Sequence, residues 1–452
     1  MTSSSSLSAD QLAPPDLWSR LVRGGVSGVG TKLVSTAIGF VATPIVLTLT
    51  GNTRYGLLTA ITAMTAFFGF ADLGLGNGLV SRLAAALPKS REESRRVVSD
   101  AWRLTTLMAV CATLIGAALT LGMPWASWLH VGPSSAGEVR PALLALIALL
   151  GVGIPLGIVQ KTLMAQQRLH VSNLWLAAGV AAGAAGLVAA AVAHAPLWVL
   201  VAGQLGGPVV VGAVSAVWLW GVDSPHLRPT GRLVSHAGMA GLLRLGGLYF
   251  VLQVAVALNY QIDTLIVAHY RSPADVTTFA ITAKLFALPL ALVGAALLPL
   301  WPAFAHARAN GDLAWVRGVW GRVTRYSAMF LMPVAVLLAL SAPWLARTWT
   351  RGLVSPPFLL CAGWAIWLIV YSLNSPQALL LNGLHLLKFQ VGTAVVMTVV
   401  NVGLSVVLTQ GIGVSGPIWG SVLAQIACTL VPTTFYLRRR LTSPGTLVTA
   451  AP

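Results

Sequence analysis

The chain has 452 residues, of which 56% are hydrophobic and only 9% are charged, and its formal net charge is +17. Soluble proteins carry about 25% charged residues, so this composition, with a mean hydropathy of +0.81, excludes a soluble globular enzyme and indicates a polytopic membrane protein. A net charge of this sign and size can indicate nucleic-acid binding. Here the basic residues are scattered over many short loops, so we expect no nucleic-acid partner.

Hydropathy and chain-breaking residues predict twelve membrane-spanning helices. The expected ranges are 24–50, 56–86, 101–122, 141–165, 172–194, 197–220, 238–268, 274–303, 319–341, 357–383, 388–409 and 413–437. The basic segment 87–103 is predicted to form a separate short helix at the membrane surface, with Glu92 and Arg96 paired one turn apart. The fold class expected from these features is all-α integral membrane.

An internal repeat predicts that the twelve helices form two parallel six-helix bundles. The tetrapeptide Ala-Ile-Thr-Ala at 60–63 recurs at 280–283, six predicted helices later and at the same place in a hairpin. Transporters are often built from two such repeats, with the substrate site between them. The expected divisions are a disordered cytoplasmic tail at 1–16, bundles at 17–221 and 237–440, a cytoplasmic linker at 222–236 and a cytoplasmic tail at 441–452.

The distribution of Lys and Arg predicts the orientation of the chain. Cytoplasmic loops of membrane proteins carry an excess of basic residues. If the first tail is cytoplasmic, most of the 28 Lys and Arg residues lie in cytoplasmic segments. The outer segments then hold only Arg54, Arg140, Arg271, Arg347 and Arg351. This bias predicts that both termini are cytoplasmic.

Lys32 and Asp72 place opposite charges in the two arms of the first predicted hairpin, which turns at Gly51. A charge near the bilayer centre costs about 3 kcal/mol on insertion scales, so it normally faces protein or water. At a rise of 1.5 Å per residue, Lys32 lies ~27 Å and Asp72 ~24 Å from the turn. Both fall near the inner face, and we predict that they pair. The pair fits a structural role and a transport pathway equally.

Asp263 and Lys284 form a second predicted pair, in adjacent helices of the second half. Their estimated depths are ~9 Å and ~15 Å below the outer ends of their helices. Arg244 lies near the cytoplasmic start of the seventh predicted helix, where its side chain can extend to the interface.

Motifs for enzymatic or metal chemistry are absent from the sequence. There is no phosphate-binding loop for ATP and no HExxH metal motif. The three cysteines lie singly in apolar runs and predict neither a disulfide framework nor a metal site. We therefore expect no cofactor and no metal, and we expect that the protein is not an enzyme.

The turn at 51–56 and the second arm carry a family resemblance. Basic residues precede the first predicted helix, the turn ends in Arg54-Tyr55-Gly56, and the next helix contains the sequence Phe-Ala-Asp-Leu-Gly-Leu-Gly-Asn-Gly-Leu at 70–79. Together with the 6+6 layout, these features resemble the oligosaccharide-lipid (polysaccharide, O-antigen type) flippases of the multidrug/oligosaccharidyl-lipid/polysaccharide exporter superfamily. The resemblance covers the whole chain in layout, and its motif match is concentrated in residues 44–82.

The resemblance implies a V-shaped pair of six-helix bundles in the bacterial inner (plasma) membrane. It also implies movement of an undecaprenyl-pyrophosphate-linked oligosaccharide from the cytoplasmic to the outer leaflet, with membrane lipids, glycosyltransferases and a glycan polymerase as partners. A multidrug or cation-coupled extruder of the same fold is the alternative. A membrane enzyme of glycan synthesis is disfavoured, because the outer loops hold only Glu138 and Asp275 as acidic residues.

A pyrophosphate moved through such a protein needs fixed cations, because burying an unpaired anion is costly. Lys284 is the basic residue placed deepest in a predicted span, so it is the first candidate for substrate binding. Lys32 is the candidate for the inward-open state and Arg244 for the cytoplasmic opening. Asp72 and Asp263 are the candidate charge partners or coupling residues, with Asp263 holding Lys284 when no substrate is bound.

Overall fold

The structure is a computed structural model that describes residues 15–65, 75–231, 239, 262–297, 300–384 and 386–442. All regular secondary structure in these residues is helical, as the sequence predicts. Nine helical segments of the described chain are long and apolar enough to cross a bilayer. Most of the predicted seventh span, 238–268, lies outside the described residues, so the count of twelve stays a prediction.

The helices before residue 232 form one group. Its members are α1 (Pro15–Ala63), α3 (Leu75–Ala86), α4 (Arg91–Gly122), α5 (Trp125–Trp128), α6 (Pro133–Ala165), α7 (Leu169–Val192) and α8 (Leu197–Trp218), followed by the short η2 (Leu219–Asp223) and η3 (Pro225–Leu227). The helix α7 packs against both α1 and α8, and α6 packs against α4 and α8. We call this group the N-half.

The helices after residue 262 form the second group, the C-half. Its members are α10 (Pro273–Leu297), α11 (Leu300–Ala309), α12 (Leu313–Trp349), α13 (Phe358–Gly383), α14 (Leu387–Ile412), η5 (Gly413–Ser415), α15 (Gly416–Ala424), η6 (Gln425–Leu430) and α16 (Val431–Thr442). The helix α13 packs against α10, α11 and α12, and α14 packs against α15.

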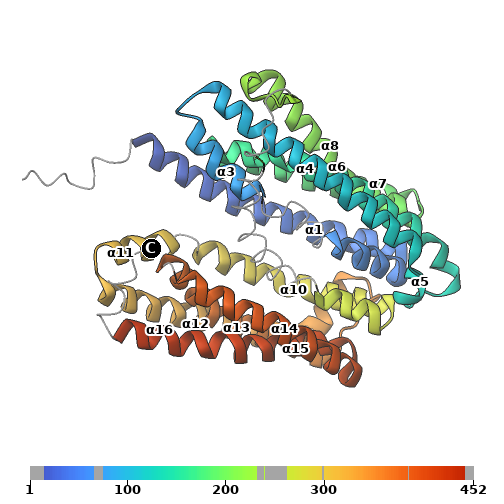
Figure 1. The fold of residues 1–452 in the computed structure, drawn as a ribbon. Coiled ribbons are helices and arrows are strands. Elements are labelled where there is room, and N and C mark those ends of the chain that lie inside the picture. Colours follow the sequence, from blue (N-terminus) through green and yellow to red (C-terminus); the bar gives the residue numbers. More distant parts are fainter. Residues whose placement is uncertain are drawn as a thin grey trace, which may run out of the picture.

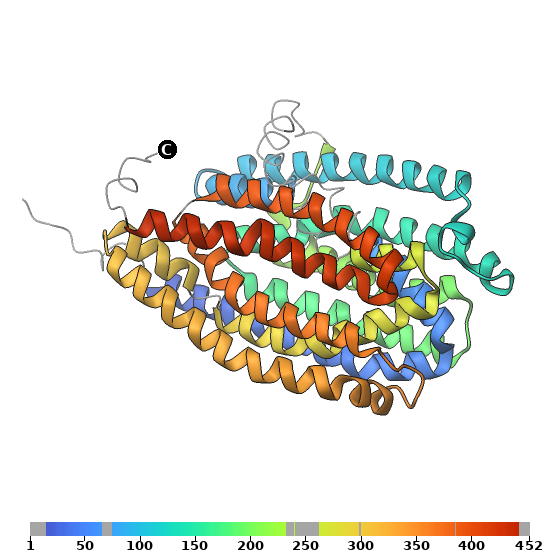
Figure 2. The same ribbon diagram turned by 90° about the horizontal axis from the view of Figure 1, so that it is seen from below.

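The N-half and the C-half form two layers that lie one above the other in Figure 1. They meet mainly through α1 and α10. The layers converge at the end that holds α5 and diverge toward the opposite end (Figure 1). We call the first of these the turn end, because Arg54 beside the turn at Gly51 bonds there to Glu138, at the start of the helix that follows α5. The start of α1 and the end of α16 both lie at this opposite end, as the view from below also shows (Figure 2).

The chain turns at Gly51, where the sequence predicts the turn of the first hairpin. Two helical arms meet at Gly51, whose φ of 76° and ψ of 168° interrupt α1. Glycine adopts positive φ without the steric cost that a Cβ imposes, so the chain can reverse here within one residue. The first arm and the second arm, which begins after Gly51, therefore pass each other closely.

The predicted separate surface helix at 87–103 is wrong in one respect. This segment is the start of α4, a single helix from Arg91 to Gly122. The side chain of Ser90 caps it by accepting the Glu93 N–H at 3.0 Å. The expected pair of Glu92 and Arg96 is confirmed, with 3.6 Å between their charged atoms.

Glycines permit the close packing of α7 on α8. A Cβ on Gly183 would lie 2.3 Å from the Gln204 carbonyl oxygen, and a Cβ on Gly207 would lie 2.1 Å from the Gly183 nitrogen. The spacing Gly179-xxx-Gly183 on α7 faces Gly203-xxx-Gly207 on α8. Small residues at such spacing let membrane helices approach closely. This contact fixes the height of Gln204, which lines the candidate site.

Candidate substrate site between the two halves

Lys284 extends from α10 of the C-half to α1 of the N-half. Its ammonium group donates a hydrogen bond to the Thr43 hydroxyl at 2.7 Å and another to the Tyr55 hydroxyl at 2.8 Å. The ammonium nitrogen lies 5.6 Å from the centre of the Tyr55 ring. Among the described residues, no carboxylate forms an ion pair with it. Lys284 is thus a cation held by neutral groups.

The turn at Gly51 explains why Thr43 and Tyr55 reach the same ammonium. Thr43 lies in the first arm of α1 and Tyr55 in the second, on either side of the chain reversal. Both side chains are buried, with exposed fractions of 4%. The Thr43 hydroxyl donates its own hydrogen to the Gly39 carbonyl at 2.6 Å, so its oxygen is free to accept from Lys284.

These groups lie on a cavity of about 270 Å³. Its walls come from both arms of α1, from α7 and α8, and from Lys284 on α10. The polar side chains on the wall are those of Ser35, Thr43, Tyr55, Thr59, Thr62 and Gln204, besides Lys284. The remaining wall is apolar. Among the described residues that line this cavity, Lys284 carries the charge.

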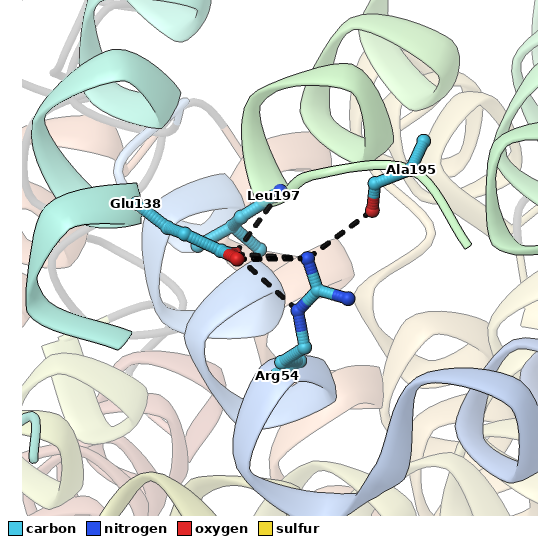
Figure 3. A network of polar contacts seen from close by, with 4 residues as sticks. All are labelled: Arg54, Glu138, Ala195 and Leu197. Carbon is cyan, nitrogen blue, oxygen red and sulfur yellow. Dashed lines mark hydrogen bonds and ion pairs between the residues drawn. The ribbon is translucent and has the colours of Figure 1, made fainter. Parts of the chain in front are cut away.

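The turn itself is fixed to the N-half by an ion pair (Figure 3). The Arg54 guanidinium donates to both carboxylate oxygens of Glu138, with a shortest distance of 2.9 Å, and to the Ala195 carbonyl at 3.2 Å. Glu138 also accepts the Leu197 N–H at 3.2 Å. Arg54 therefore joins the turn to the start of α6 and to the loop between α7 and α8.

The same turn contacts the C-half. The Asn52 carbonyl accepts a hydrogen bond from the Thr277 hydroxyl at 2.6 Å, and the Asn52 amide donates to the Leu353 carbonyl at 2.7 Å. Gly56 approaches α10 so closely that a Cβ there would lie 1.7 Å from the Pro273 carbonyl oxygen. These contacts hold the two halves together at the turn end.

Aromatic side chains add to the contact at the turn end. The His269 ring stacks on Trp128 with 4.7 Å between centroids, and its Nδ1 lies 3.1 Å from the Trp128 carbonyl oxygen. Phe40 of α1 stacks on Trp349 of α12 at 4.1 Å. Both pairs join the N-half to the C-half.

Asp263 lies in a separate cluster inside the C-half. Its carboxylate accepts hydrogen bonds from Ser421 at 2.7 Å and from Ser405 at 3.3 Å. The amide oxygen of Asn401 lies 3.0 Å from each serine hydroxyl. The predicted pair of Asp263 and Lys284 is not formed: the structure gives Asp263 two serines and gives Lys284 groups on the N-half. The two residues therefore contact different helices.

Of the other predicted site residues, the structure describes Lys32 alone. Lys32 is exposed on α1. Asp72 and Arg244 lie outside the described residues, so the predicted pair of Lys32 and Asp72 and the role of Arg244 stay predictions. Thr43 and Tyr55 were not predicted as site residues. The available signal was their position as polar residues within the apolar arms on either side of Gly51.

The fold is that of solved transporters. The chain matches the inward-facing conformation of a multidrug resistance MATE family transporter of the MOP superfamily with a TM-score of 0.77 and 14% identity, over 94% of this chain and 100% of that one. The outward-facing conformation of a multidrug resistance MATE family transporter matches with a TM-score of 0.61 and 13% identity, over 94% and 96% of the two chains. The protein is thus a multi-pass membrane protein with a MATE-like fold.

Sequence relationships narrow this class. Residues 47–350 match the family described as "Polysaccharide biosynthesis protein", and the chain belongs to that family. It is 24% identical over 297 residues to a putative O-antigen export protein of Yersinia pseudotuberculosis, covering 62% of this chain and 64% of that relative. The match thus spans less than two thirds of the relative's length. The resemblance to a polysaccharide export family, predicted from the turn, the second arm and the helix layout, is confirmed by these matches, and the fold is shared with transporters of the MOP superfamily.

Proposed function

We propose that this protein moves a lipid-linked oligosaccharide with a pyrophosphate head group from the cytoplasmic to the outer leaflet of the bacterial plasma membrane by alternating access. The observation that carries the proposal is Lys284, an ammonium group on a cavity between the halves whose observed partners are hydroxyls. A charged residue inside a membrane protein is costly and commonly marks a substrate path. Family membership and the named export relative support the same substrate class.

The partners of Lys284 suit a site that must bind and release an anion. A hydrogen bond from an ammonium to a hydroxyl is already charge-assisted and contributes roughly 1.5–3 kcal/mol. A phosphate oxygen adds the attraction between opposite charges, so it gains more from Lys284 than the neutral hydroxyls of Thr43 and Tyr55 do. A carboxylate partner would compete with phosphate for the same ammonium. The Tyr55 hydroxyl can donate its own hydrogen to the same anion.

The contacts at the turn end support an inward-open state. If the turn end is the outer side, as the charge bias predicts, the halves are closed toward the outside by the bonds of Asn52 and by the packing of Gly56 on Pro273. The better match to an inward-facing transporter agrees with this assignment. A substrate from the cytoplasmic leaflet would approach Lys284 from the end at which the layers diverge.

Lys32 and Arg244 are proposed to guide the anion at the cytoplasmic side. Lys32 is exposed on the same arm of α1 that carries Thr43, eleven residues or about 16.5 Å away along the helix axis. An exposed cation on the path to Lys284 would raise the local concentration of an anionic head group. Neutralising Lys32 should therefore reduce the rate of transport at low substrate concentration and leave the maximal rate unchanged.

Asp263 is proposed as the group that couples transport to a proton or sodium gradient. It is a buried carboxylate that accepts from two serine hydroxyls, and in the described residues no basic side chain pairs with it. An unpaired buried carboxylate is a natural site for a proton or a small cation. Asp263→Asn should abolish the dependence of transport on the gradient, measured in vesicles with an imposed pH or sodium difference.

Lys284→Gln tests the proposal directly. In proteoliposomes that hold purified protein and a fluorescent undecaprenyl-pyrophosphate oligosaccharide, the variant should lower the flipping rate at least tenfold, because one charge-assisted bond of roughly 1.5–3 kcal/mol is lost. Lys89→Gln is the matched control, since Lys89 sits on the surface at 3.4 Å from Glu93. Wild-type flipping by Lys284→Gln at normal thermal stability would refute the role of this lysine.

A cation-coupled multidrug extruder is the alternative, and the same vesicles separate the two functions. Export of lipophilic cations with no flipping of the lipid-linked glycan would favour the extruder, as would an unchanged rate of such export after Lys284→Gln. A cationic drug gains nothing from a neighbouring ammonium group. The relatives are named as exporters and transporters, in agreement with a protein that is not an enzyme. A glycan polymerase and glycosyltransferases are the proposed partners.

A further inference from the structure

The polar wall of the cavity beside Lys284 has a chemical pattern that phosphate does not explain. The Thr59 hydroxyl donates to the Tyr55 carbonyl at 2.9 Å, and the Thr62 hydroxyl donates to the Leu58 carbonyl at 2.8 Å. Each hydroxyl hydrogen is therefore used within the helix, and each oxygen keeps lone pairs that can accept. A phosphate oxygen is an acceptor too, so these threonines offer it nothing.

Two more polar side chains on this wall lack partners in the described part of the chain. The structure gives no hydrogen bond to the amide of Gln204 or to the hydroxyl of Ser35. The backbone contact of α7 with α8 holds Gln204 in place, because the Gln204 carbonyl lies against Gly183. An amide offers both donors and an acceptor, so the wall is suited to a neutral ligand with many hydroxyl groups.

The cavity wall thus carries two chemically distinct kinds of polar group. Lys284 and the Tyr55 hydroxyl supply donors, the oxygens of Thr59 and Thr62 supply acceptors, and the Gln204 amide supplies both. Its volume of about 270 Å³ is slightly below the roughly 300–1,000 Å³ of pockets for drug-sized ligands. That size is sufficient for a single pyranose ring.

We infer that this cavity binds the sugar residue attached directly to the pyrophosphate, and that Thr59, Thr62 and Gln204 determine which sugar is accepted. The inference rests on the proposed function. A sugar attached to a phosphate held at Lys284 must lie close to it, and Thr59 and Thr62, about one and two helical turns after Tyr55 on the second arm of α1, line the same cavity. Sugar hydroxyls would donate to the threonine oxygens, and Gln204 would contact a hydroxyl or an acetamido group.

Binding to purified full-length protein in lipid nanodiscs tests this inference. The probes are farnesyl pyrophosphate without sugar and the same molecule carrying one glucose, galactose, N-acetylglucosamine or N-acetylgalactosamine. The wild type should bind the best sugar-bearing probe at least tenfold more tightly than the sugar-free probe. If no sugar improves binding over farnesyl pyrophosphate, the inference is wrong.

The variants Thr59→Val and Thr62→Val remove an acceptor oxygen without changing side-chain shape. Each should weaken binding of the best sugar-bearing probe at least fivefold and leave the sugar-free probe unchanged, and Thr59→Ser should restore the affinity. Thr48→Val is the matched control, because the Thr48 hydroxyl donates to the Pro44 carbonyl in the same way at 2.8 Å and does not line the cavity. Equal effects on both probes would overturn the sugar subsite.

Lys284→Gln separates a failure of this subsite from a failure of the proposed function. If Lys284→Gln weakens both probes while the threonine variants weaken neither, the anion site stands and the sugar subsite is refuted. If Lys284→Gln leaves the sugar-free probe unchanged, the anion site itself is refuted. If Thr62→Val unfolds the protein, Thr62→Ser provides the test. Serine keeps the acceptor oxygen, so this variant should retain full selectivity for the sugar, and a loss of selectivity would refute the role of that oxygen.

Discussion

Replacing Gly56 with alanine tests whether α1 and α10 separate at the turn end during transport. A Cβ at this position would lie 1.7 Å from the Pro273 carbonyl oxygen, and 2.9 Å from the Thr277 hydroxyl. Ordinary contacts of a Cβ begin at 3.4 Å, so the two atoms must move apart by a further 1.7 Å. Because the obstructing atom belongs to the backbone of the other half, rotation of a side chain cannot relieve the clash.

The clash should act on one conformation and not on folding as a whole. Overpacking a well-packed contact costs about 1–3 kcal/mol, and this cost vanishes when the halves part at the turn end. An energy of 1–3 kcal/mol changes a conformational equilibrium by roughly 5- to 150-fold. We therefore expect Gly56→Ala to shift the protein toward the state that is open at the turn end.

Distances between spin labels measure this shift. Labels on Thr53→Cys and Leu353→Cys, in a background without the three native cysteines, report the separation of the halves, because the neighbouring Asn52 contacts Leu353. Gly56→Ala should add a longer distance, and Gly30→Ala, where a Cβ meets nothing within 4 Å, should not. A folded Gly56→Ala protein with an unchanged distance distribution would refute the reasoning.

Two further predictions concern the anchoring of the turn and the orientation of the chain. Arg54→Gln and Glu138→Gln should each lower the free energy of unfolding by about 1–2 kcal/mol, measured by thermal unfolding, and the double variant should lower it by little more than either single change. This destabilisation is smaller than that for a fully buried pair, because the two side chains are 27% and 32% exposed and water screens their charges. Additive effects would show that the pair in Figure 3 is not coupled. A cysteine at Ser134 should react with a membrane-impermeant reagent added outside intact cells and one at Glu92 should not; the reverse pattern would invert the predicted topology.

The sequence was sufficient to predict features that depend on composition and on strong local signals. The membrane class follows from the low charge content, and the first hairpin follows from two apolar arms around Gly51. The separate surface helix at 87–103 was wrong because a change from polar to apolar composition was taken as a helix boundary. No proline interrupts the chain between Arg91 and Gly122, so the helix continues from the polar turns into the apolar ones.

The partner of Lys284 could not be predicted in the same way. Counting residues along a helix gives the depth of a side chain, because each residue adds 1.5 Å. It does not give the direction in which the side chain points around the bundle. Asp263 has an estimated depth similar to that of Lys284, but it contacts Ser405 and Ser421, whereas Lys284 contacts Thr43 of the other half. To predict which side chains meet between the halves, one must know how each helix is rotated and packed against its neighbours, and the hydropathy pattern of the sequence does not give this.

The turn between 51 and 56 joins three contacts that matter for transport. Arg54 fixes the turn to the N-half, Gly56 packs on the C-half, and Tyr55 between them accepts from Lys284. An anion that binds the Lys284 ammonium in place of the Tyr55 hydroxyl therefore replaces a hydrogen bond between the halves with a bond to the ligand. A ligand shifts a conformational equilibrium only by its difference in affinity for the two states. Under the proposed function, substrate binding at Lys284 supplies that difference, because the cost of parting the halves falls once Lys284 no longer needs Tyr55.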